Sequence, residues 1–328
     1  MNAAVVESFG TPPRYTTFAN PLAGDGEVLV RVIAAGFHPI VRALASGSHY
    51  GSTGELPFVP GVDGVGRLED GTRVYFGAAR SPFGSFAEIS VTKRELTIPL
   101  PESVGDAAAA ALANPGMSSW VALRERAKFV SGESVLIIGA TGAAGKLAVQ
   151  IARRMGARHI VAVGRHINDG TLKELGADAI VSLDQDHDVL IAALRNEFTE
   201  EGIDVVLDYL WGQPAEAVLE AISQKGLRHS APRIRYVQIG DIAGNLWALS
   251  ADGAFLHCQN AFIEPFCFIE PALMKVEYRQ LFERANNVWV RRTEIDFFDG
   301  NELLIIWCRL RFLALCFEHS DKIVQRLG

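Results

Sequence analysis

The stretch Ser134-Val-Leu-Ile-Ile-Gly-Ala-Thr-Gly-Ala-Ala-Gly-Lys146 runs an apolar strand into a glycine-spaced turn and then into the start of a helix. Gly139 can end the strand in a tight turn, Gly142 lets backbone N–H groups reach a phosphate, and Gly145 lets the helix lie close to the sheet. A chain with 31 glycines produces such spacing by chance, so the spacing alone indicates only a glycine-rich turn. Its position between strand and helix predicts a dinucleotide pyrophosphate at the helix N-terminus.

The segments after this turn alternate between strand-like and helix-like patterns. The helix that follows has one apolar face, formed by Leu147, Ala148, Ile151 and Met155, and is expected to end at Gly156. Further strand-like runs lie at 159–163, 179–182, 204–209 and 235–239, with helix-like stretches at 188–198 and 213–224. This alternation predicts an α/β fold with a Rossmann-type, doubly wound parallel sheet and right-handed crossovers.

The end of the second strand indicates which dinucleotide is bound. NAD-binding folds place an acidic residue about 20 positions past the glycines, where it accepts hydrogen bonds from the ribose hydroxyls. This chain has Gly164-Arg165 there. A carboxylate would repel a 2′-phosphate, whereas glycine leaves room and the arginine guanidinium can hydrogen-bond the phosphate oxygens. NADPH is therefore predicted, with His166 and Asn168 close enough to assist. The alternative is that Arg165 is an ordinary solvated side chain.

Composition and charge exclude several other classes of protein. The 328 residues, 49% of them apolar, suffice for two packed domains, and the formal charge of −7 argues against nucleic acid or an anionic membrane as partner. The first residues lack the pattern of a signal peptide. The apolar stretch 303–317 is shorter than a membrane span and contains Arg309 and Arg311. We therefore expect a cytoplasmic protein, with reduced thiols at Cys258, Cys267, Cys308 and Cys316.

The region before the nucleotide-binding pattern has a different character. Strand-like runs at 27–33, 72–76 and 86–90 lie among glycines and prolines, which predicts a compact, mostly antiparallel β domain. An alanine-rich helix is expected at 106–113, and a second helix is expected to begin within Asn114–Trp120. These patterns predict a first domain at 1–115 and a Rossmann domain at 116–249.

The order of these parts resembles the medium-chain dehydrogenase/reductase superfamily, and within it the zinc-free quinone oxidoreductase branch. The resemblance covers about 1–245 and is carried, besides the glycine turn, by several segments in the expected order: 26–32, 35–39, 57–66, 71–74, 84–88 and 111–120. It implies a GroES-like fold for the first domain, completed by part of 250–328. It also implies hydride transfer from NADPH to a quinone or an α,β-unsaturated carbonyl, and it allows a homodimer.

The zinc-dependent members of the superfamily differ from this chain at two places. They carry a cysteine in the segment that corresponds to Ala35-Gly-Phe-His38, and Gly-His-Glu where this chain has Gly61-Val-Asp63. A catalytic zinc site requires thiolate or imidazole ligands. We therefore expect no metal in this protein.

Two residues lie where the resemblance implies the substrate side of the site. His38, in a segment whose relatives usually have Asn, and Tyr50 could each hydrogen-bond a carbonyl oxygen on which negative charge develops. The alternatives are that His38 is satisfied within a turn before Pro39 and that Tyr50 only packs. Asp63 is expected to hold a turn rather than to perform acid–base work.

On the cofactor side, the resemblance assigns groups of residues to each part of NADPH. Asn114 and Ser118 would lie near the nicotinamide, and Tyr209 and Leu210 near the ribose. The carboxamide would lie beside Gln238 to Gly240. The pyrophosphate would contact the backbone of Thr141, Gly142, Ala143 and Ala144.

The final part of the chain does not follow the family. From about residue 252 the sequence cannot be aligned to the resemblance, although 272–287 has a helical apolar pattern. A shifted reading frame and genuine divergence both remain open. Because the acceptor side is weakly specified, an NADPH-binding sensor or interaction protein is the alternative function. A third reading is enoyl reduction of an acyl chain within a larger synthase.

Overall fold

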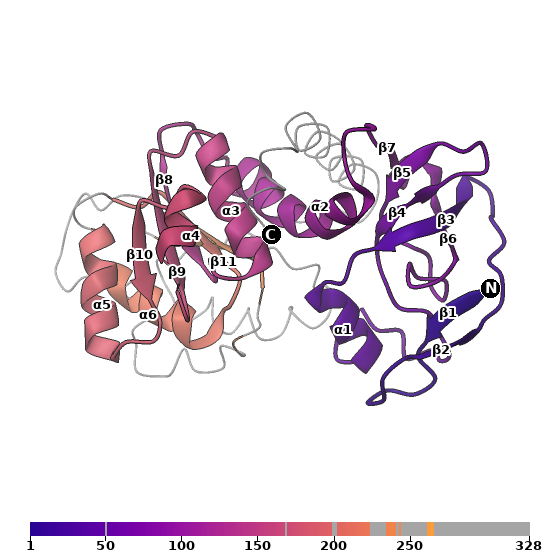
Figure 1. Cartoon of the computed structure of the whole chain (residues 1–328). Coiled ribbons are helices and arrows are strands. Elements are labelled where there is room, and N and C mark those ends of the chain that lie inside the picture. The colour runs from indigo at the N-terminus through magenta and orange to yellow at the C-terminus, as the bar shows by residue number, and fades with distance from the viewer. Residues whose placement is uncertain are drawn as a thin grey trace. The chain divides into compact units, whose positions relative to one another are not determined.

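The computed structural model describes residues 1–49, 51–167, 169–198, 202–223, 234–240, 243 and 261–265. These residues divide into two compact units: unit 1 runs from Met1 to Met117, and unit 2 begins at Ser118 (Figure 1). The division falls near the expected boundary at residue 115. The expected completion of the first domain by part of 250–328 lies outside the described residues of unit 1.

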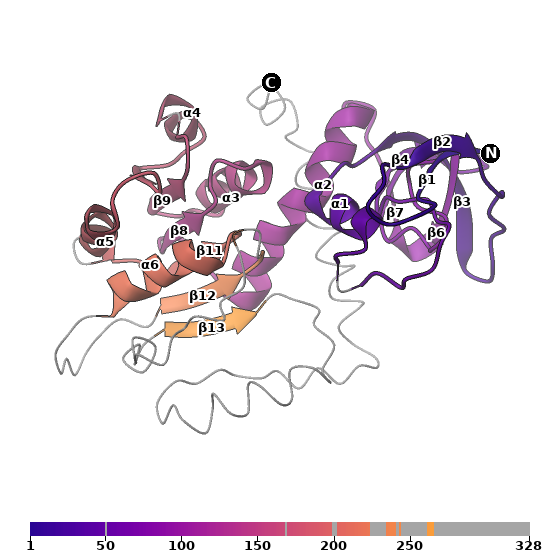
Figure 2. The ribbon, with the colours of Figure 1, turned by 90° about the horizontal axis from the view of Figure 1, so that it is seen from below.

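Unit 2 is built on a six-stranded parallel sheet with the strand order β10-β9-β8-β11-β12-β13. In Figure 2, β12 and β13 lie side by side at one margin of this sheet. This order confirms the predicted doubly wound fold. The strands are β8 (Ser134–Ile138), β9 (His159–Gly164), β10 (Ala179–Ser182), β11 (Val205–Asp208), β12 (Ile234–Gln238) and β13 (Ala261–Pro265).

Four helices connect these strands, and right-handed crossovers place α3 and α4 on the opposite face from α5 and α6. The main core joins the buried strand side chains, such as Leu136 and Val206, to Leu194 of α5 and Val218 of α6. Figure 1 shows α5 beside β10. The helices are α3 (Ala143–Arg154), α4 (Asp169–Glu174), α5 (His187–Asn196) and α6 (Gly212–Ile222).

The carboxyl ends of the central strands lie level with one another. Asp208, the last residue of β11, is paired with Ile138 of β8 on one side and with Gln238 of β12 on the other. The strand order reverses at β8, because the chain moves from β8 to β10 in one direction and then returns to β11. In doubly wound sheets ligands bind at the carboxyl edge at such a reversal.

The glycine turn after β8 has the predicted conformation. Gly139 has a φ of +89°, a left-handed value that side chains rarely adopt. A Cβ on Gly145 would lie 2.1 Å from the carbonyl oxygen of Gly139, so only glycine allows α3 to approach the strand this closely. Leu147, Ala148 and Ile151 form the expected buried face of α3.

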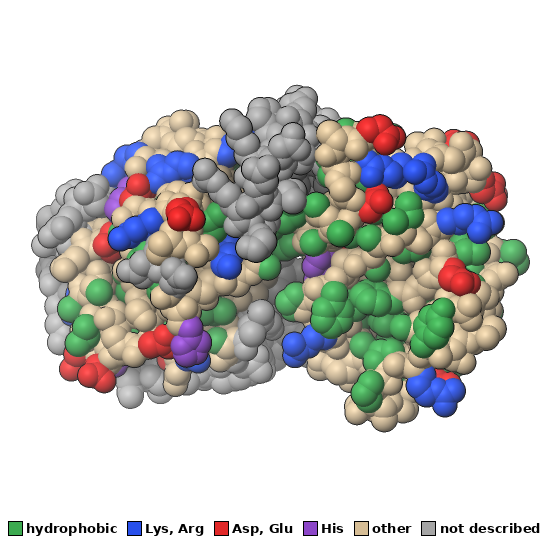
Figure 3. All heavy atoms as spheres, viewed as in Figure 1, with side chains coloured by type: hydrophobic (Ala, Val, Ile, Leu, Met, Phe, Trp, Pro, Cys, Tyr) green, Lys and Arg blue, Asp and Glu red, His purple; other side chains and the backbone are tan. Residues whose placement is uncertain are grey.

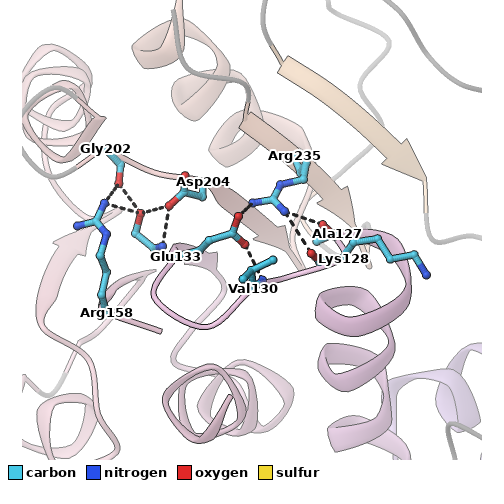
Figure 4. A network of polar contacts seen from close by, with 9 residues as sticks. Ala127, Lys128, Val130, Glu133, Arg158, Gly202, Asp204 and Arg235 are labelled. Carbon is cyan, nitrogen blue, oxygen red and sulfur yellow. Dashed lines mark hydrogen bonds and ion pairs between the residues drawn. The ribbon is translucent and has the colours of Figure 1, made fainter. Parts of the chain in front are cut away.

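A network of polar contacts holds the opposite, amino-terminal edge of the sheet (Figure 4). The guanidinium of Arg235, at the start of β12, donates to the Ala127 carbonyl at 2.8 Å and to the Glu133 carboxylate at 2.6 Å. The Ser134 amide, at the start of β8, donates to the Asp204 carboxylate at 2.9 Å. Arg158 donates to the carbonyl of Gly202 at 3.2 Å. Charged side chains therefore connect the strand starts at this edge of the sheet.

Unit 1 contains the predicted antiparallel β structure. It consists of a five-stranded sheet with the order β6-β3-β4-β5-β7 and a two-stranded sheet, β1-β2. Every strand pairing within these two sheets is antiparallel. Val30, Val74 and Phe76 belong to its core. The strands are β1 (Asn2–Val5), β2 (Arg14–Thr17), β3 (Glu27–Ala35), β4 (Gly64–Arg67), β5 (Arg73–Phe76), β6 (Ile89–Lys93) and β7 (Thr97–Pro99), with a 3-10 turn at Arg94–Leu96.

Two helices of unit 1 differ from the sequence prediction. Helix α1 (Pro39–Ser46) was not predicted; Pro39 starts it, which suits a residue without an N–H, and Gly47 ends it with a φ of +75°. The expected break at Asn114 is wrong, because α2 (Asp106–Val121) continues through Pro115 and into a π-helical turn at Ala122–Arg126. A proline inside a helix removes one hydrogen bond and need not end it when the residues on both sides are helical.

The close approach of α3 to the end of β8 at Gly145 predicts that a side chain at this position lowers stability. We expect Gly145→Ala to lower the free energy of unfolding by about 3 kcal/mol, because the new methyl group meets backbone that cannot move aside. The matched control is Gly142→Ala, where a Cβ would meet only the Gly139 oxygen at 3.5 Å; the cost there should be below about 1 kcal/mol. Urea unfolding of both variants measures the difference, and equal stabilities would contradict the packing argument.

Candidate functional site

The turn that leads into α3 forms an exposed cradle for an anion. Gly142 is the N-cap of α3, and Gly142 and Ala143 are exposed. The first amides of a helix have no acceptor within the helix and carry partial positive charge. Since the space where a Gly142 side chain would stand is open, these amides fit a pyrophosphate. Thr141, Ala143 and Ala144 lie in the same turn and first helical residues, as predicted.

At the end of β9, Gly164 and Arg165 lie next to this turn. A Cβ on Gly164 would come within 2.8 Å of the Thr141 side chain. The glycine therefore makes room for Thr141, and does not leave the empty space that the sequence suggested. The Arg165 side chain is exposed and has no hydrogen-bond or ion-pair partner among the residues that the structure describes.

The residues that follow Arg165 border a cavity. The His166 amide donates to the Asp184 carboxylate at 2.6 Å, and the His166 backbone has a φ of +49°. Asn168, the other expected assistant, lies outside the described residues. The cavity has a volume of about 510 Å³, within the usual range for small-molecule sites. Residues after β9 and around β10 line it, among them His166, Ile167, Ser182 and Asp184.

A buried carboxylate at the end of β11 organises the loop where the resemblance places the ribose. Asp208 accepts hydrogen bonds from the amides of Leu210 at 2.8 Å and Trp211 at 2.9 Å, and from the Tyr236 hydroxyl at 2.7 Å. Trp211 has a φ of +57°, which is strained for a bulky residue. Its ring packs edge-on against Tyr236, with ring centroids 6.5 Å apart. Asp208 and Tyr236 therefore hold this loop in place.

Burial controls the ionisation of this pair. Desolvation raises the pKa of the Asp208 carboxyl above its usual value, although the hydrogen bonds from Trp211, Tyr236 and Leu210 act in the opposite direction. Burial and the neighbouring Asp208 also raise the pKa of Tyr236 well above its usual value. Tyr236 therefore stays a hydrogen-bond donor to Asp208 at physiological pH. The sequence analysis did not select either residue, although an aspartate directly after an apolar strand was an available signal.

The structure brings several predicted cofactor residues together in unit 2. The Tyr209 hydroxyl lies 3.4 Å from Ser118 Oγ, and burial raises the pKa of Tyr209 to about 12. A Cβ on Gly240 would lie 2.5 Å from the Tyr209 carbonyl oxygen, and one on Gly139 would lie 3.2 Å from Leu210. Gln238 ends β12 beside Asp208. These residues therefore meet at the carboxyl edge of the sheet.

Asn114 lies on α2, one helical turn before Ser118, and is half-buried. The division between the two units falls between these two residues.

In unit 1, His38 belongs to a buried polar group. It is the N-cap of α1, and its side chain is only 8% exposed. His38 Nε2 lies 3.4 Å from Asp63 Oδ1, and the Tyr75 hydroxyl donates to Asp63 Oδ2 at 2.7 Å. Asp63 comes directly before β4 and is almost wholly buried. Tyr50, the other predicted substrate-side residue, lies outside the described residues.

An apolar surface begins next to this buried polar group, because the exposed Phe37 directly precedes His38 in the chain. Phe37 is 69% exposed and packs edge-on against Phe86, with ring centroids 6.1 Å apart. Figure 3 shows apolar side chains gathered on the visible face of unit 1. A separate cavity in unit 1, lined by Phe9, Leu44 and Phe58 among others, has a volume of about 200 Å³, which is below the usual range for ligand sites.

In the part of the chain that the structure describes, no group of three or more His, Cys, Asp or Glu side chains is arranged to hold a metal ion. No described helix has the length and apolar character that crossing a membrane requires.

Comparison with known proteins identifies the family. Residues 143–230 match the family described as zinc-binding dehydrogenase. A probable NADPH-dependent quinone reductase of Emericella nidulans is 30% identical over 279 residues, which cover 74% of this chain and 76% of that protein. The quinone oxidoreductase of Lama guanicoe is 28% identical over 239 residues, covering 69% of this chain and 71% of the relative. A phthiocerol polyketide synthase subunit of Mycobacterium tuberculosis is 32% identical over 249 residues, which are 71% of this chain but 11% of that protein.

Solved structures show the same fold. The quinone oxidoreductase of Thermus thermophilus, determined alone and with NADPH, has a TM-score of 0.65 and 27% identity, covering 87% of this chain and 85% of that one. A mycobacterial protein in complex with NADPH has a TM-score of 0.70 at 22% identity, covering 98% and 90%. The chain belongs to the medium-chain dehydrogenase/reductase superfamily, in its quinone oxidoreductase-like branch. It therefore combines a Rossmann-type unit with a GroES-like unit.

The buried Asp208 predicts how stability depends on pH. Because the pKa of Asp208 is raised in the folded protein, the folded state binds more protons than the unfolded state above pH 3.8. The contribution of Asp208 to the free energy of unfolding therefore falls as pH rises through the folded pKa. In Asp208→Asn, which keeps an acceptor for the Leu210 and Trp211 amides, this decline should disappear. Urea unfolding from pH 4 to pH 7 measures it. Parallel pH curves for the two proteins would mean that Asp208 ionises normally.

Proposed function

We propose that this protein is an NADPH-dependent oxidoreductase that transfers a hydride to a quinone or an α,β-unsaturated carbonyl without zinc. The observation that carries the proposal is the exposed cradle at Gly142, at the carboxyl edge of a doubly wound sheet and beside the exposed Arg165. Family membership supports hydride transfer as the reaction type. NADPH supplies the hydride when it is bound.

The assignment of residues to NADPH follows the carboxyl edge of the sheet. The amides of Ala143 and Ala144 would bind the pyrophosphate, beside the backbone of Thr141 and Gly142. The Gly142 N–H itself donates to the Gly139 carbonyl at 3.1 Å. Ser118, Tyr209, Leu210, Gln238 and Gly240 would surround the ribose and nicotinamide, since the structure gathers them at that edge. Asn114 completes the assignment on the resemblance, and Asn168 on its position shortly after Arg165 in the sequence.

Arg165 would select NADPH over NADH. The exposed Arg165 guanidinium has no partner within the described part of the chain, and it could form charge-assisted hydrogen bonds to a 2′-phosphate. Gly164 adds no carboxylate that would repel that phosphate. The nearby Asp184 carboxylate uses one of its oxygens, Oδ2, to accept a hydrogen bond from the His166 amide.

Unit 1 would supply the acceptor side. His38 would hydrogen-bond the acceptor oxygen and deliver a proton to it, with Tyr50 as a second candidate donor. The exposed Phe37 ring beside His38 offers a flat apolar surface, which suits a quinone or enone better than a charged substrate.

The zinc-free part of the proposal depends on the donor set. Where zinc-dependent members have Gly-His-Glu, this chain has Val62 between Gly61 and Asp63, and an aliphatic side chain cannot ligate a metal. The Ala35–His38 segment contains no cysteine thiolate. The hydride acceptor would therefore be a group that is electrophilic without a Lewis acid.

The direct test follows NADPH oxidation at 340 nm with a benzoquinone, a naphthoquinone, an enal, an enone and an enoyl thioester, each with and without a metal chelator. We expect turnover with quinones or enones that the chelator leaves unchanged. Preference for the enoyl thioester would favour the synthase-type reaction, to which the polyketide synthase match also points. Tight NADPH binding with no turnover of any acceptor would favour the sensor function instead.

Arg165 gives a separate prediction about coenzyme choice. Arg165→Asp should weaken NADPH binding by about 10- to 100-fold while NADH binding changes little, because one charge-assisted contact to the 2′-phosphate is replaced by repulsion. Calorimetric titration with both coenzymes measures the ratio. The control is Arg14→Asp, an equal change in net charge at an exposed side chain of unit 1. Unchanged selectivity in Arg165→Asp would remove this residue from the site.

A further inference from the structure

Asp63 is the central member of the buried polar group in unit 1. One of its carboxylate oxygens, Oδ2, accepts the Tyr75 hydroxyl at 2.7 Å. The other oxygen, Oδ1, lies 3.4 Å from His38 Nε2. Oδ1 and Nε2 are both buried, and neither has a hydrogen-bond partner among the described residues. Buried polar atoms rarely remain without partners. Oδ1 and Nε2 therefore have only each other, while the Tyr75 hydroxyl fixes the opposite side of the carboxylate.

The local backbone is built to admit this contact. A Cβ on Gly36 would lie 2.2 Å from His38 Nε2 and 3.0 Å from Asp63 Oδ1. Only glycine at position 36 therefore lets the imidazole fold back onto the carboxylate. The Gly36 amide also donates to the Asp63 carbonyl at 3.3 Å, which ties the end of β3 to the start of β4.

The two nitrogens of His38 consequently have different surroundings. Nε2 is buried against Asp63. Nδ1 has no hydrogen-bond partner among the described residues, and it is not one of the buried atoms without a partner. The 8% of the side chain that remains exposed must therefore lie away from Nε2. A carboxylate accepts only an N–H, so Asp63 favours a proton on Nε2. Nδ1 is then the nitrogen left for proton exchange.

We propose that Asp63, held by Tyr75, is a positioning residue that keeps a proton on His38 Nε2, so that His38 Nδ1 delivers the proton to the reduced acceptor. This inference rests on the proposed function and identifies the proton path of the same site. It also extends the expectation that Asp63 itself performs no acid–base work, because the carboxylate acts only through the imidazole.

The step starts from the doubly protonated imidazole. The hydride would come from the C–H bond of the reduced nicotinamide, which breaks as NADPH is oxidised to NADP⁺; a new bond to hydrogen forms at the acceptor, and an electron pair moves onto the acceptor oxygen. The Nδ1–H bond of His38 breaks as an O–H bond forms, which neutralises that oxygen. The ring keeps its remaining proton on Nε2 beside Asp63, and Nδ1 takes a new proton from water.

The first experiment observes the histidine tautomer directly. Protein labelled with ¹⁵N-histidine is studied by NMR at alkaline pH, where imidazoles are neutral; the His38 signal is assigned by its loss in His38→Asn. We expect the wild-type ring to carry its proton on Nε2 and the Asp63→Asn ring to shift toward Nδ1–H. A wild-type proton on Nδ1, or an unchanged tautomer in Asp63→Asn, would overturn the proposal.

The second experiment is a double-mutant cycle on turnover with the best acceptor. We expect Asp63→Asn and His38→Asn each to lower kcat by about 10²-fold with little change in KM or NADPH affinity, and Tyr75→Phe to lower it less. In the His38→Asn background, Asp63→Asn should cost no further activity. Circular dichroism verifies folding. The matched control is Asp106→Asn, which loses a 2.8 Å carboxylate pair with Arg73 in the same unit and should keep kcat.

The outcomes separate this inference from the proposed function. An equal loss of kcat from Asp63→Asn with and without His38 would show a structural role and overturn the inference. If the wild-type protein reduces no acceptor, the proposed function fails. The tautomer spectra then still decide whether Asp63 positions the ring.

Discussion

The close approach of α3 to β8 is the constraint on which the nucleotide-binding unit depends. Gly145 lies so near the Gly139 carbonyl that any side chain would push the helix away from the sheet. With glycine there, the first amides of α3 stand at the carboxyl edge, level with the ends of β9, β11 and β12. One backbone contact therefore fixes both the packing of the unit and the position of its anion cradle.

Buried carboxylates then hold the loops of both units. Asp208 fixes the loop after β11 through two amides and the Tyr236 hydroxyl, and Asp63 connects His38 to Tyr75. A buried carboxylate is stable only when its oxygens are engaged, so such residues leave their neighbours little freedom. The amino-terminal edge of the sheet uses charged pairs such as Arg235 and Glu133 for stability alone. The two edges thus have different tasks.

Most strands of unit 2 were predictable because their apolar periodicity is a local property, whereas β1, β2, β4 and β7 of unit 1 were not predicted. The predicted runs at 159–163 and 179–182 agree with β9 and β10 to within one residue. The break expected at Asn114 was wrong, because α2 continues through Pro115. The glycine turn was predictable for the same local reason, whereas the use of the Gly164 space by Thr141 was not, since these residues are distant in sequence.

Short-range patterns of glycine and apolar spacing were enough to predict the doubly wound sheet and its glycine turn, and motifs in the expected order were enough to recognise the family. Which of the candidate residues meet could be seen only in the folded chain. The Tyr236 hydroxyl reaches Asp208 and the Tyr75 hydroxyl reaches Asp63 because neighbouring strands bring side chains from separate segments close together. Register and burial are collective properties of the folded chain, and no single segment encodes them.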